Sequence, residues 1–174
     1  MNNVFLGIDP GLHGAIAKWF KDENELFIYD MPTTKIRGKL RVDEDALLLL
    51  LGNELIGVDV VTIEKVGAMP QQGVGSTATF MRHAGILVGA CRMAAMMNGN
   101  LVVNEVTPAT WKAACGLVLP AGSTLKARKD ASRMLARRLF PEDGSMFLRA
   151  KDDGRAEAAL LARHGSRAVS SNAG

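Results

Sequence analysis

Three short apolar runs at the start of the chain restrict its fold more than any other feature. They cover Val4–Ile8, Ala15–Phe20 and Leu26–Met31, and only the turn segments DPGLHG and KDENE separate them. Each run contains β-branched or aromatic residues and is bounded by turn-forming residues, which is the pattern of strands joined by short turns. The spacing therefore predicts three consecutive strands that pair antiparallel as a meander.

Strands and helices alternate through the rest of the chain. Val58–Glu64 is almost continuously apolar, which predicts a central strand of a covered sheet, and Leu101–Val106 predicts a fifth strand. A polar, basic loop is expected over Pro32–Lys39. Helices are expected from Asp43, from Ser76 to about Met97, over PATWKAA, from about Leu125 to Leu139, and from about Asp152 to Gly165. This order predicts an α/β, ribonuclease H-like fold with a mixed five-stranded sheet, three antiparallel strands then parallel ones, and helices on both faces.

The size and composition of the chain indicate one soluble domain. Its 174 residues are enough to bury a core, and we assign 1–165 to a single domain and 166–174 to a flexible tail. No apolar run approaches the ~20 residues of a membrane span, and no signal-peptide pattern opens the chain. The two cysteines are far apart, which favours free thiols in a cytoplasmic or organelle-like compartment over secretion.

Two acids stand where predicted strands end. Asp9 follows the first apolar run, and Glu64 ends the fourth. If these two strands are parallel neighbours, both carboxylates lie at one edge of the sheet, where open α/β sheets place their ligands. Either acid alone has about even odds of being a strand-end residue that faces solvent.

A second pair of acids lies at the start of the last predicted helix. Asp153 and Glu157 are four residues apart and share a helix face, and the small Gly154 and Ala156 permit a close approach to the sheet. Acids also suit the positive end of a helix dipole, which explains Asp152 and Asp153 well but Glu157 poorly. Four carboxylates without His or Cys favour Mg²⁺, with Mn²⁺ able to replace it. Two such ions about 4 Å apart can catalyse phosphodiester hydrolysis.

Basic residues gather in the last third of the chain, although the net charge is only +3. The basic run extends from Lys126 to Arg155 and ends against Asp152 and Asp153. A charge run of this kind is usually a solvated helix face. Its position beside the acids favours instead a surface that receives a polyanion.

Six segments resemble, in their order and spacing, the RuvC-type Holliday junction resolvases, most closely the phage and chloroplast members of that superfamily. They are GIDPGLHGAIA, VTIEKVGAMPQQG, FMRHAGILVGA, VTPATWK, KDASRMLARRLFP and KDDGRAEAALLARHG. The resemblance extends over roughly Val4 to Gly165, nearly the whole chain. GIDPG alone also occurs in other ribonuclease H-like proteins, whereas the ordered set is specific.

The resemblance implies a Mg²⁺-dependent endodeoxyribonuclease that works as a homodimer and resolves four-way DNA junctions by paired symmetric nicks. It also implies that the catalytic residues and metal ligands, with two ions per site, are Asp9, Glu64, Asp153 and Glu157. Many family members space the last two acids by three residues, which falls on Gly154 here. Phage-like members carry DGRAE with a spacing of four, so Asp153 is chosen and Asp152 is kept as the less certain ligand.

The same resemblance indicates the DNA and dimer contacts. Lys112 and Lys129 match family lysines near the scissile phosphate, and the helix around Phe80, Ile86 and Met93 matches the dimerisation element. The loop after the fourth strand matches one that reaches the junction centre, but it lacks the aromatic wedge of bacterial members. The expected DNA-binding residues are Lys112, Lys126, Arg128, Lys129, Arg133, Lys151 and Arg155, with Met69, Gln71 and Gln72 as less certain base contacts.

Two further classes of function stay open at this point. A ribonuclease H-like nuclease that cuts other branched DNA or RNA–DNA hybrids would carry the same four acids. A catalytically idle junction-binding protein would be expected to have lost two or more of them, and all are present. An actin-like nucleotide-binding module that uses GIDPG as a phosphate loop would need a second phosphate motif and a larger two-lobed chain, and the sequence shows neither.

Overall fold

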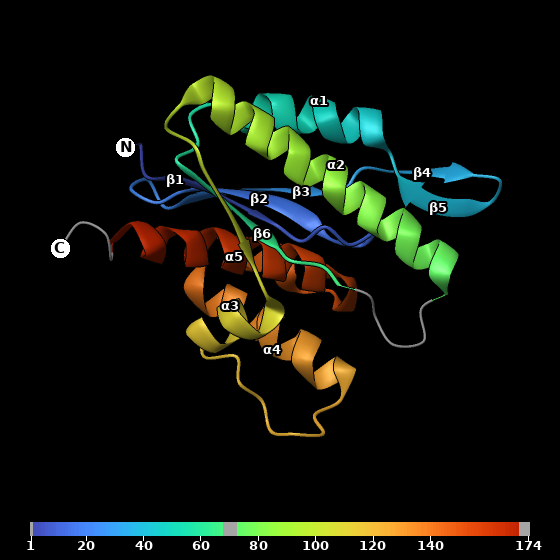
Figure 1. Cartoon of the computed structure of the whole chain (residues 1–174). Coiled ribbons are helices and arrows are strands. Elements are labelled where there is room, and N and C mark those ends of the chain that lie inside the picture. The colour runs from blue at the N-terminus through green and yellow to red at the C-terminus, as the bar shows by residue number, and fades with distance from the viewer. Residues whose placement is uncertain (1, 68–72, 171–174) are drawn as a thin grey trace.

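The computed structural model describes residues 2–67 and 73–170, and it shows a five-stranded sheet with helices on both faces (Figure 1). The candidate base contacts Met69, Gln71 and Gln72 lie outside the described residues and stay predictions. The strands of the sheet lie in the order β3 (Glu25–Asp30), β2 (Ala15–Phe20), β1 (Val4–Ile8), β6 (Val60–Glu64) and β7 (Val102–Val106).

The pairing of the strands confirms the predicted mixed sheet. Strands β1, β2 and β3 pair antiparallel as a meander, whereas β1 with β6 and β6 with β7 pair parallel. Ile8 is paired with Ile63 in the β1–β6 register. The next residues along the chain, Asp9 and Glu64, therefore leave the sheet at the same edge.

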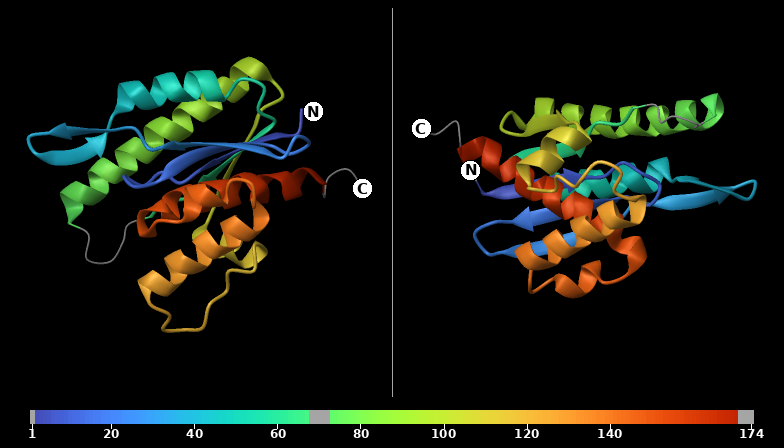
Figure 2. Two further views of the ribbon diagram at one scale, coloured as in Figure 1. Left: turned by 180° about the vertical axis from the view of Figure 1, so that it is seen from behind. Right: turned by 90° about the horizontal axis from the view of Figure 1, so that it is seen from below.

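Two helical layers enclose the sheet. Figure 2 shows α1 (Glu44–Glu54) and α2 (Val74–Asn98) on one face and α5 (Asp153–Ser170) on the other. Helix α4 (Leu125–Leu139) packs outside α5, and the short α3 (Pro108–Ala114) lies beside them. Between α4 and α5 are two turns of 3₁₀ helix, η1 (Gly144–Phe147) and η2 (Ala150–Asp152).

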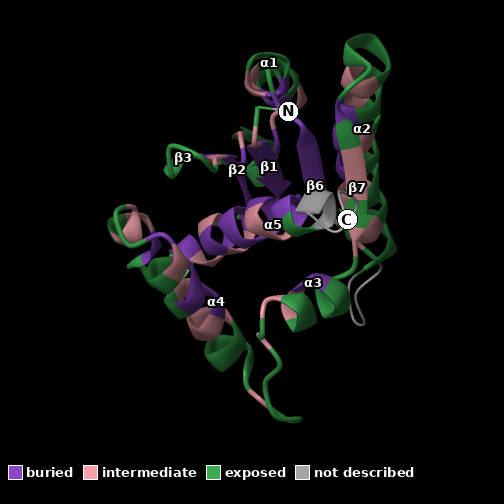
Figure 3. Ribbon diagram, turned by 90° about the vertical axis from the view of Figure 1, so that its left-hand side faces the viewer, coloured by how far each residue is buried: buried purple, intermediate pink, exposed green. Residues whose placement is uncertain are grey.

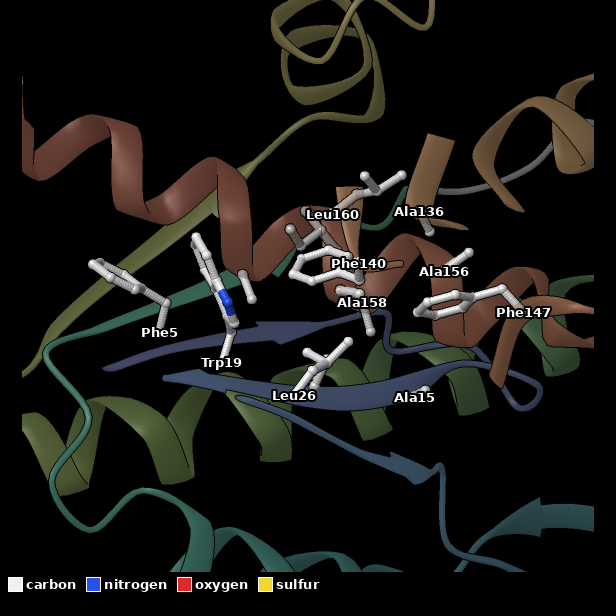
Figure 4. Close-up of a cluster of buried hydrophobic side chains, with 14 of the residues drawn as sticks. Phe5, Ala15, Trp19, Leu26, Ala136, Phe140, Phe147, Ala156, Ala158 and Leu160 are labelled. Carbon is white, nitrogen blue, oxygen red and sulfur yellow. The ribbon is translucent and has the colours of Figure 1, made fainter. Parts of the chain in front are cut away.

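Each face of the sheet has its own hydrophobic core. On the α5 side, Phe5, Trp19 and Leu26 of the sheet meet Phe140 and Phe147, which follow α4 (Figure 4). The core on the α1 and α2 side is built from aliphatic residues, including Leu47 and Leu51 of α1. As predicted, Asp43 is the N-cap of α1, because its carboxylate accepts a hydrogen bond from the Ala46 backbone N–H at 3.1 Å.

Helix α5 packs so closely on the sheet that two contact positions leave no room for a Cβ atom. A Cβ added to Gly7 of β1 would lie 2.0 Å from the Ala158 carbonyl oxygen. One added to Gly165 would lie 2.4 Å from the Thr62 hydroxyl oxygen of β6. Gly165 therefore allows α5 to pack closely on β6. The prediction that Gly165 ends the last helix is wrong, because α5 continues to Ser170.

A second difference concerns the segment after β3. The polar loop predicted over Pro32–Lys39 is instead a β-hairpin of β4 (Thr33–Ile36) and β5 (Lys39–Val42). Its two-residue turn, Arg37-Gly38, has positive φ at both positions, 51° and 76°. Such turns usually carry Asn-Gly or Asp-Gly. Because Arg-Gly is not a typical pair for this turn, the sequence did not indicate a hairpin.

Helix α2 also begins earlier than predicted. Its N-cap is Gly73 and it starts at Val74, two residues before Ser76, and it ends as expected with Gly99 in the left-handed conformation, φ 63°. In the described part of the chain, no helix is long and apolar enough to cross a membrane.

Candidate active site

Asp9 lies in the tight turn that joins β1 to β2. Its carboxylate accepts a hydrogen bond from the Gly11 backbone N–H at 3.0 Å, and its own N–H donates to the Ala15 carbonyl at 3.0 Å. A Cβ on Gly14 would lie 2.1 Å from the Asp9 carbonyl oxygen. The turn therefore wraps closely around Asp9 and holds its carboxylate at the sheet edge.

Glu64, at the end of β6, is held by the indole of Trp111. The Trp111 Nε1–H donates to Glu64 Oε1 at 2.9 Å, and the Trp111 side chain is fully buried in α3. A buried indole needs a partner for its N–H, and Glu64 provides it. The sequence gives no sign of this bond, because the bond joins residues 47 positions apart.

Asp153 and Glu157 reach the same edge from the first turns of α5. A Cβ on Gly154 would lie 2.2 Å from the His13 carbonyl oxygen, so the start of α5 is in contact with the β1–β2 turn. Lys129 of α4 binds Asp153 at 2.6 Å, and Lys112 of α3 binds Glu157 at 2.9 Å. Four acids and two lysines from five separate segments of the chain thus gather in one place.

Ser132 is a further residue of the site that the sequence did not reveal. Its hydroxyl lies 3.0 Å from Glu157 Oε1, and the residue is buried between α4 and α5. Ser132 follows Lys129 by three residues, so both lie on the same face of α4. That spacing is the only sign of its position in the sequence.

The structure separates the neighbouring acids Asp152 and Asp153. The Asp152 side chain is buried, and it accepts hydrogen bonds from the Arg149 backbone N–H at 2.7 Å and from the Arg149 guanidinium at 2.8 Å. Burial alone would raise the pKa of Asp152, but Arg149 outweighs burial and holds the pKa below its usual value. Asp152 therefore caps η2, while Asp153 faces Lys129 and the other acids.

Burial, and after it the neighbouring charges, shifts the protonation of Asp9 and Glu64. Burial, together with the charges of Glu64, Glu157 and Asp153, raises the pKa of Asp9 to about 7, despite the opposing hydrogen bond from Gly11. Burial also raises the pKa of Glu64, which the Trp111 hydrogen bond and Lys112 partly offset. The site holds more negative charge than its two lysines can balance.

The donor set suits a hard divalent cation. Four carboxylates supply oxygen ligands without nitrogen or sulfur, and a Mg²⁺ or Mn²⁺ ion would relieve their repulsion. With the side chains placed as they are, no three Asp, Glu, His or Cys residues of the described chain converge as a ready ligand set. Lys129 and Lys112 occupy the positions next to Asp153 and Glu157 instead.

Most of the basic residues predicted to bind DNA are engaged within the protein. Lys112 and Lys129 bind site acids, and Arg155 makes a bidentate ion pair with Asp30 at 2.6 Å. Lys126 and Arg133 both bind Asp130, and Arg133 also donates to the Leu148 carbonyl. The two without an ion-pair partner among the described residues are Arg128 and Lys151, and both are exposed.

Two open grooves lie beside α4. One groove, of about 470 Å³, runs between α3 and α4 and is lined by Lys112, Arg128 and Ser132, and the first and last of these contact Glu157. The other, of about 550 Å³, is lined by Asp153 and Lys129 and extends to the β4–β5 hairpin. The second groove therefore links an acid of the site to the hairpin.

The predicted dimer helix has an exposed outer face. Along α2, Met93 is 61 % exposed, whereas Phe80 and Ile86 are half-buried. Figure 3 shows many exposed residues along α2 and mainly buried or intermediate ones along α5, on the other side of the sheet.

The fold is similar to that of two solved proteins of the RuvC type. RuvC of T. thermophilus, solved in complex with a Holliday junction substrate, matches with a TM-score of 0.53 and 16% identity, over 98% of this chain and 96% of that one. The yeast mitochondrial Holliday junction resolvase Ydc2 matches with a TM-score of 0.56 and 14% identity, over 93% of this chain and 77% of that one.

These likenesses confirm the predicted RuvC-like fold over nearly the whole chain. These two neighbours do not resolve the branch, so the closer likeness to the phage and chloroplast members stays a prediction. No protein-family model and no curated protein sequence matches the chain.

Proposed function

We propose that the protein is a structure-selective endodeoxyribonuclease that resolves four-way DNA junctions by paired symmetric nicks. One observation carries the proposal: the carboxylates of Glu64, Glu157 and Asp153 lie close enough to Asp9 for their charges to raise its pKa, and an open groove reaches this group at Asp153. Two solved structures of similar fold support it: one is a mitochondrial Holliday junction resolvase by name, and the other is RuvC in complex with a Holliday junction substrate.

In this proposal the four acids hold two Mg²⁺ ions per site, and Mn²⁺ can replace them. Bound ions of this kind activate a water and stabilise the leaving oxygen in phosphodiester hydrolysis. Asp9 would ligate as its anion, and because its pKa without metal is raised to about 7, metal binding at lower pH would release a proton from it. The Trp111 hydrogen bond would fix the direction of the Glu64 carboxylate.

Lys112 and Lys129 would change partners when DNA binds. In the free protein their ammonium groups offset the charge of Glu157 and Asp153. With cations on the acids, the same two ammonium groups would be released to the scissile phosphate and would stabilise the charge that develops there. Arg128 and Lys151 would contact neighbouring phosphates on either side.

Paired nicks require two active sites that act on one junction. We propose a homodimer formed through the outer face of α2, around Phe80, Ile86 and Met93. Two copies related by a twofold axis place identical sites on opposing strands. Such a protein would act where cellular or viral DNA recombines, in the cytoplasm or an organelle.

The proposal is tested with synthetic four-way junction, fork, plain duplex and RNA–DNA hybrid, each offered with Mg²⁺. We expect symmetric, ligatable nicks in the junction and little cutting of the other substrates. Asp9→Asn and Glu64→Gln should keep junction binding and lose cleavage, whereas Glu23→Gln, in the exposed β2–β3 turn, should cut like the wild type. Equal cutting of plain duplex would contradict junction selectivity, and preferred cutting of the hybrid would favour a ribonuclease H-like activity.

A further inference from the structure

The β4–β5 hairpin is a basic arm that the proposed site does not use. Its ten residues, Thr33–Val42, include four cations and no acid. Lys35, Arg37 and Lys39 are exposed, and Arg41 is half-buried. Figures 1 and 2 show the hairpin projecting beyond the five-stranded sheet, to which it is not paired.

The cations of the hairpin differ from several of those on α4 and α5 in having no ion-pair partner among the described residues. None of the four makes an ion pair within residues 2–67 and 73–170. On the helices, by contrast, Lys126, Arg133 and Arg155 are already bound to acids. Charges that the fold itself does not neutralise are the ones free to bind a polyanion.

The tip of the hairpin carries an arginine where the backbone favours another residue. Arg37 has φ 51°, a left-handed conformation that Asn, Asp and Gly adopt more readily. Its side chain is exposed and makes no hydrogen bond within the described chain. Arg37 adopts an unfavourable backbone conformation, and its side chain makes no hydrogen bond within the described chain. This combination points to a contact with another molecule.

The base of the hairpin is fixed to the rest of the protein. The Asp43 N–H donates to the Pro32 carbonyl at 2.9 Å across the base, and the Asp43 side chain caps α1. Val42 is buried in the core on the α1 and α2 side. Thr33 and Leu40, from the two strands, line the groove of about 550 Å³ that also contains Asp153 and Lys129. The hairpin therefore begins at the end of this groove that leads away from the acid cluster.

We propose that the β4–β5 hairpin binds the phosphate backbone of the DNA arm that leaves the active site through this groove, with Lys35, Arg37 and Lys39 as the contacting residues. The inference rests on the proposed function, because it takes DNA as the ligand of the acid cluster. It adds a binding surface distant from the scissile phosphate and independent of the α4 basic run. Its contribution is to hold the departing arm in position.

The test measures binding of a four-way junction by fluorescence anisotropy, at a series of salt concentrations and in an Asp9→Asn background that prevents cleavage. The variant Lys35→Ala/Arg37→Asn/Lys39→Ala should bind about tenfold to a hundredfold more weakly at moderate salt. The slope of log K against log salt should become less negative by about 0.9 for each lost phosphate contact. Asn is chosen at position 37 because it tolerates positive φ, so the hairpin is kept.

Single variants provide a matched control. Arg37→Asn should weaken binding and Arg37→Lys should restore it, while Lys21→Asn should have no effect. Lys21 is an exposed lysine in the β2–β3 turn, at the opposite end of the sheet from Asp9. Circular dichroism and thermal unfolding confirm that each variant is folded.

The outcomes separate this inference from the proposed function. Hairpin variants that match Lys21→Asn in both affinity and salt slope would overturn the inference, even if the parent prefers junctions. A parent protein that binds junction and duplex equally would contradict the proposed function. A less negative slope of log K against log salt in the hairpin variants would support DNA binding by the hairpin in either case.

Discussion

Helices α5 and α2 lie on opposite faces of the same sheet, but they contact it in different ways. Helix α5 touches β1 through Gly7, backbone against backbone, and Ala158–Ala162 is fully buried. Helix α2 buries only four residues, and Met96 and Met97 near its end are 84 % and 80 % exposed. One face of the sheet is therefore covered by a helix in direct backbone contact with it. The other face is covered by a helix that exposes apolar side chains to solvent.

This difference follows from what each helix must hold in place. The first turns of α5 carry two of the four acids, and a small shift of the helix would separate Asp153 and Glu157 from Asp9 and Glu64. Glycine and alanine at the contact leave no flexible side chain between helix and sheet, so the helix has one position. The outer face of α2 carries no site residue, and its methionines can adapt to a second surface.

The largest expected effect comes from placing a methyl group in the tight contact. Gly7→Ala would drive a Cβ to within 2.0 Å and 2.3 Å of backbone atoms of α5. Neither atom can rotate away, so we expect a loss of about 3 kcal/mol or more in the free energy of unfolding.

The control for that variant is Gly52→Ala in α1, on the other face. A Cβ there meets no atom within 4 Å, and alanine favours a helix over glycine, so a gain of about 0.5 to 1 kcal/mol is expected. Urea unfolding measures both. Equal effects of the two substitutions would show that the faces are not packed differently.

The next largest effect concerns the charge that α5 brings to the sheet edge. The pKa of Asp9 is raised from 3.8 to about 7 in the folded state, so the folded protein binds more protons than the unfolded chain between about pH 4 and pH 7. Stability without divalent cations therefore falls as the pH rises through this window. Asp9→Asn removes the ionisation and should be more stable than the wild type at pH 8, by up to about 4 kcal/mol, because each pKa unit corresponds to about 1.4 kcal/mol.

Unfolding in the presence of a chelator at pH 5 and pH 8 checks this prediction. The advantage of Asp9→Asn should be larger at pH 8, and Mg²⁺ should stabilise the wild type more than the variant. Asp45→Asn, at an exposed position in the first turn of α1, should show no such pH dependence. A constant difference between the two pH values would rule out a strongly raised pKa for Asp9.

A smaller effect is expected where a side chain positions an acid. Trp111→Phe removes the hydrogen bond that lowers the pKa of Glu64, so the acidic limb of the cleavage pH profile should move to higher pH. The lost bond and volume should lower stability by about 1 to 2 kcal/mol.

Trp19→Phe is the matched control for Trp111→Phe. Trp19 is buried in the core on the α5 side, and its Nε1 has no hydrogen-bond partner among the described residues. It should lower stability through lost volume without moving the pH profile. A shift of the profile in both variants would mean that packing, and not the bond to Glu64, sets the pKa.

The smallest effect on folding is expected on the outer face of α2. Met93→Lys changes an exposed side chain and should alter the stability of a protomer by less than about 0.5 kcal/mol. It should nevertheless shift the protein from dimer to monomer in sedimentation, because a lysine would be buried at the proposed interface. Met134→Lys, on exposed α4, should leave the mass unchanged, and a wild-type monomer would remove the paired-nick proposal.

Much of the fold could be predicted because it depends on local pattern. The apolar runs and short turns at the start of the chain specify antiparallel strands, and α4 begins and ends at the predicted Leu125 and Leu139. The segment over Pro32–Lys39 was predicted wrongly, because its strands are exposed and lack an apolar pattern. Gly165 was misread because a glycine that ends a helix and one that permits close packing look the same in sequence.

The sequence by itself determined which acids stand at strand and helix ends, and that a hard metal would suit them. Only the tertiary structure decided which of them meet. Asp152 and Asp153 are identical in local sequence terms, yet one is bound by Arg149 and the other faces Lys129. Their roles differ because Asp152 ends η2 and Asp153 begins α5, so their side chains point in different directions, and what lies in the direction of Asp153 is set by α4, a separate segment of the chain.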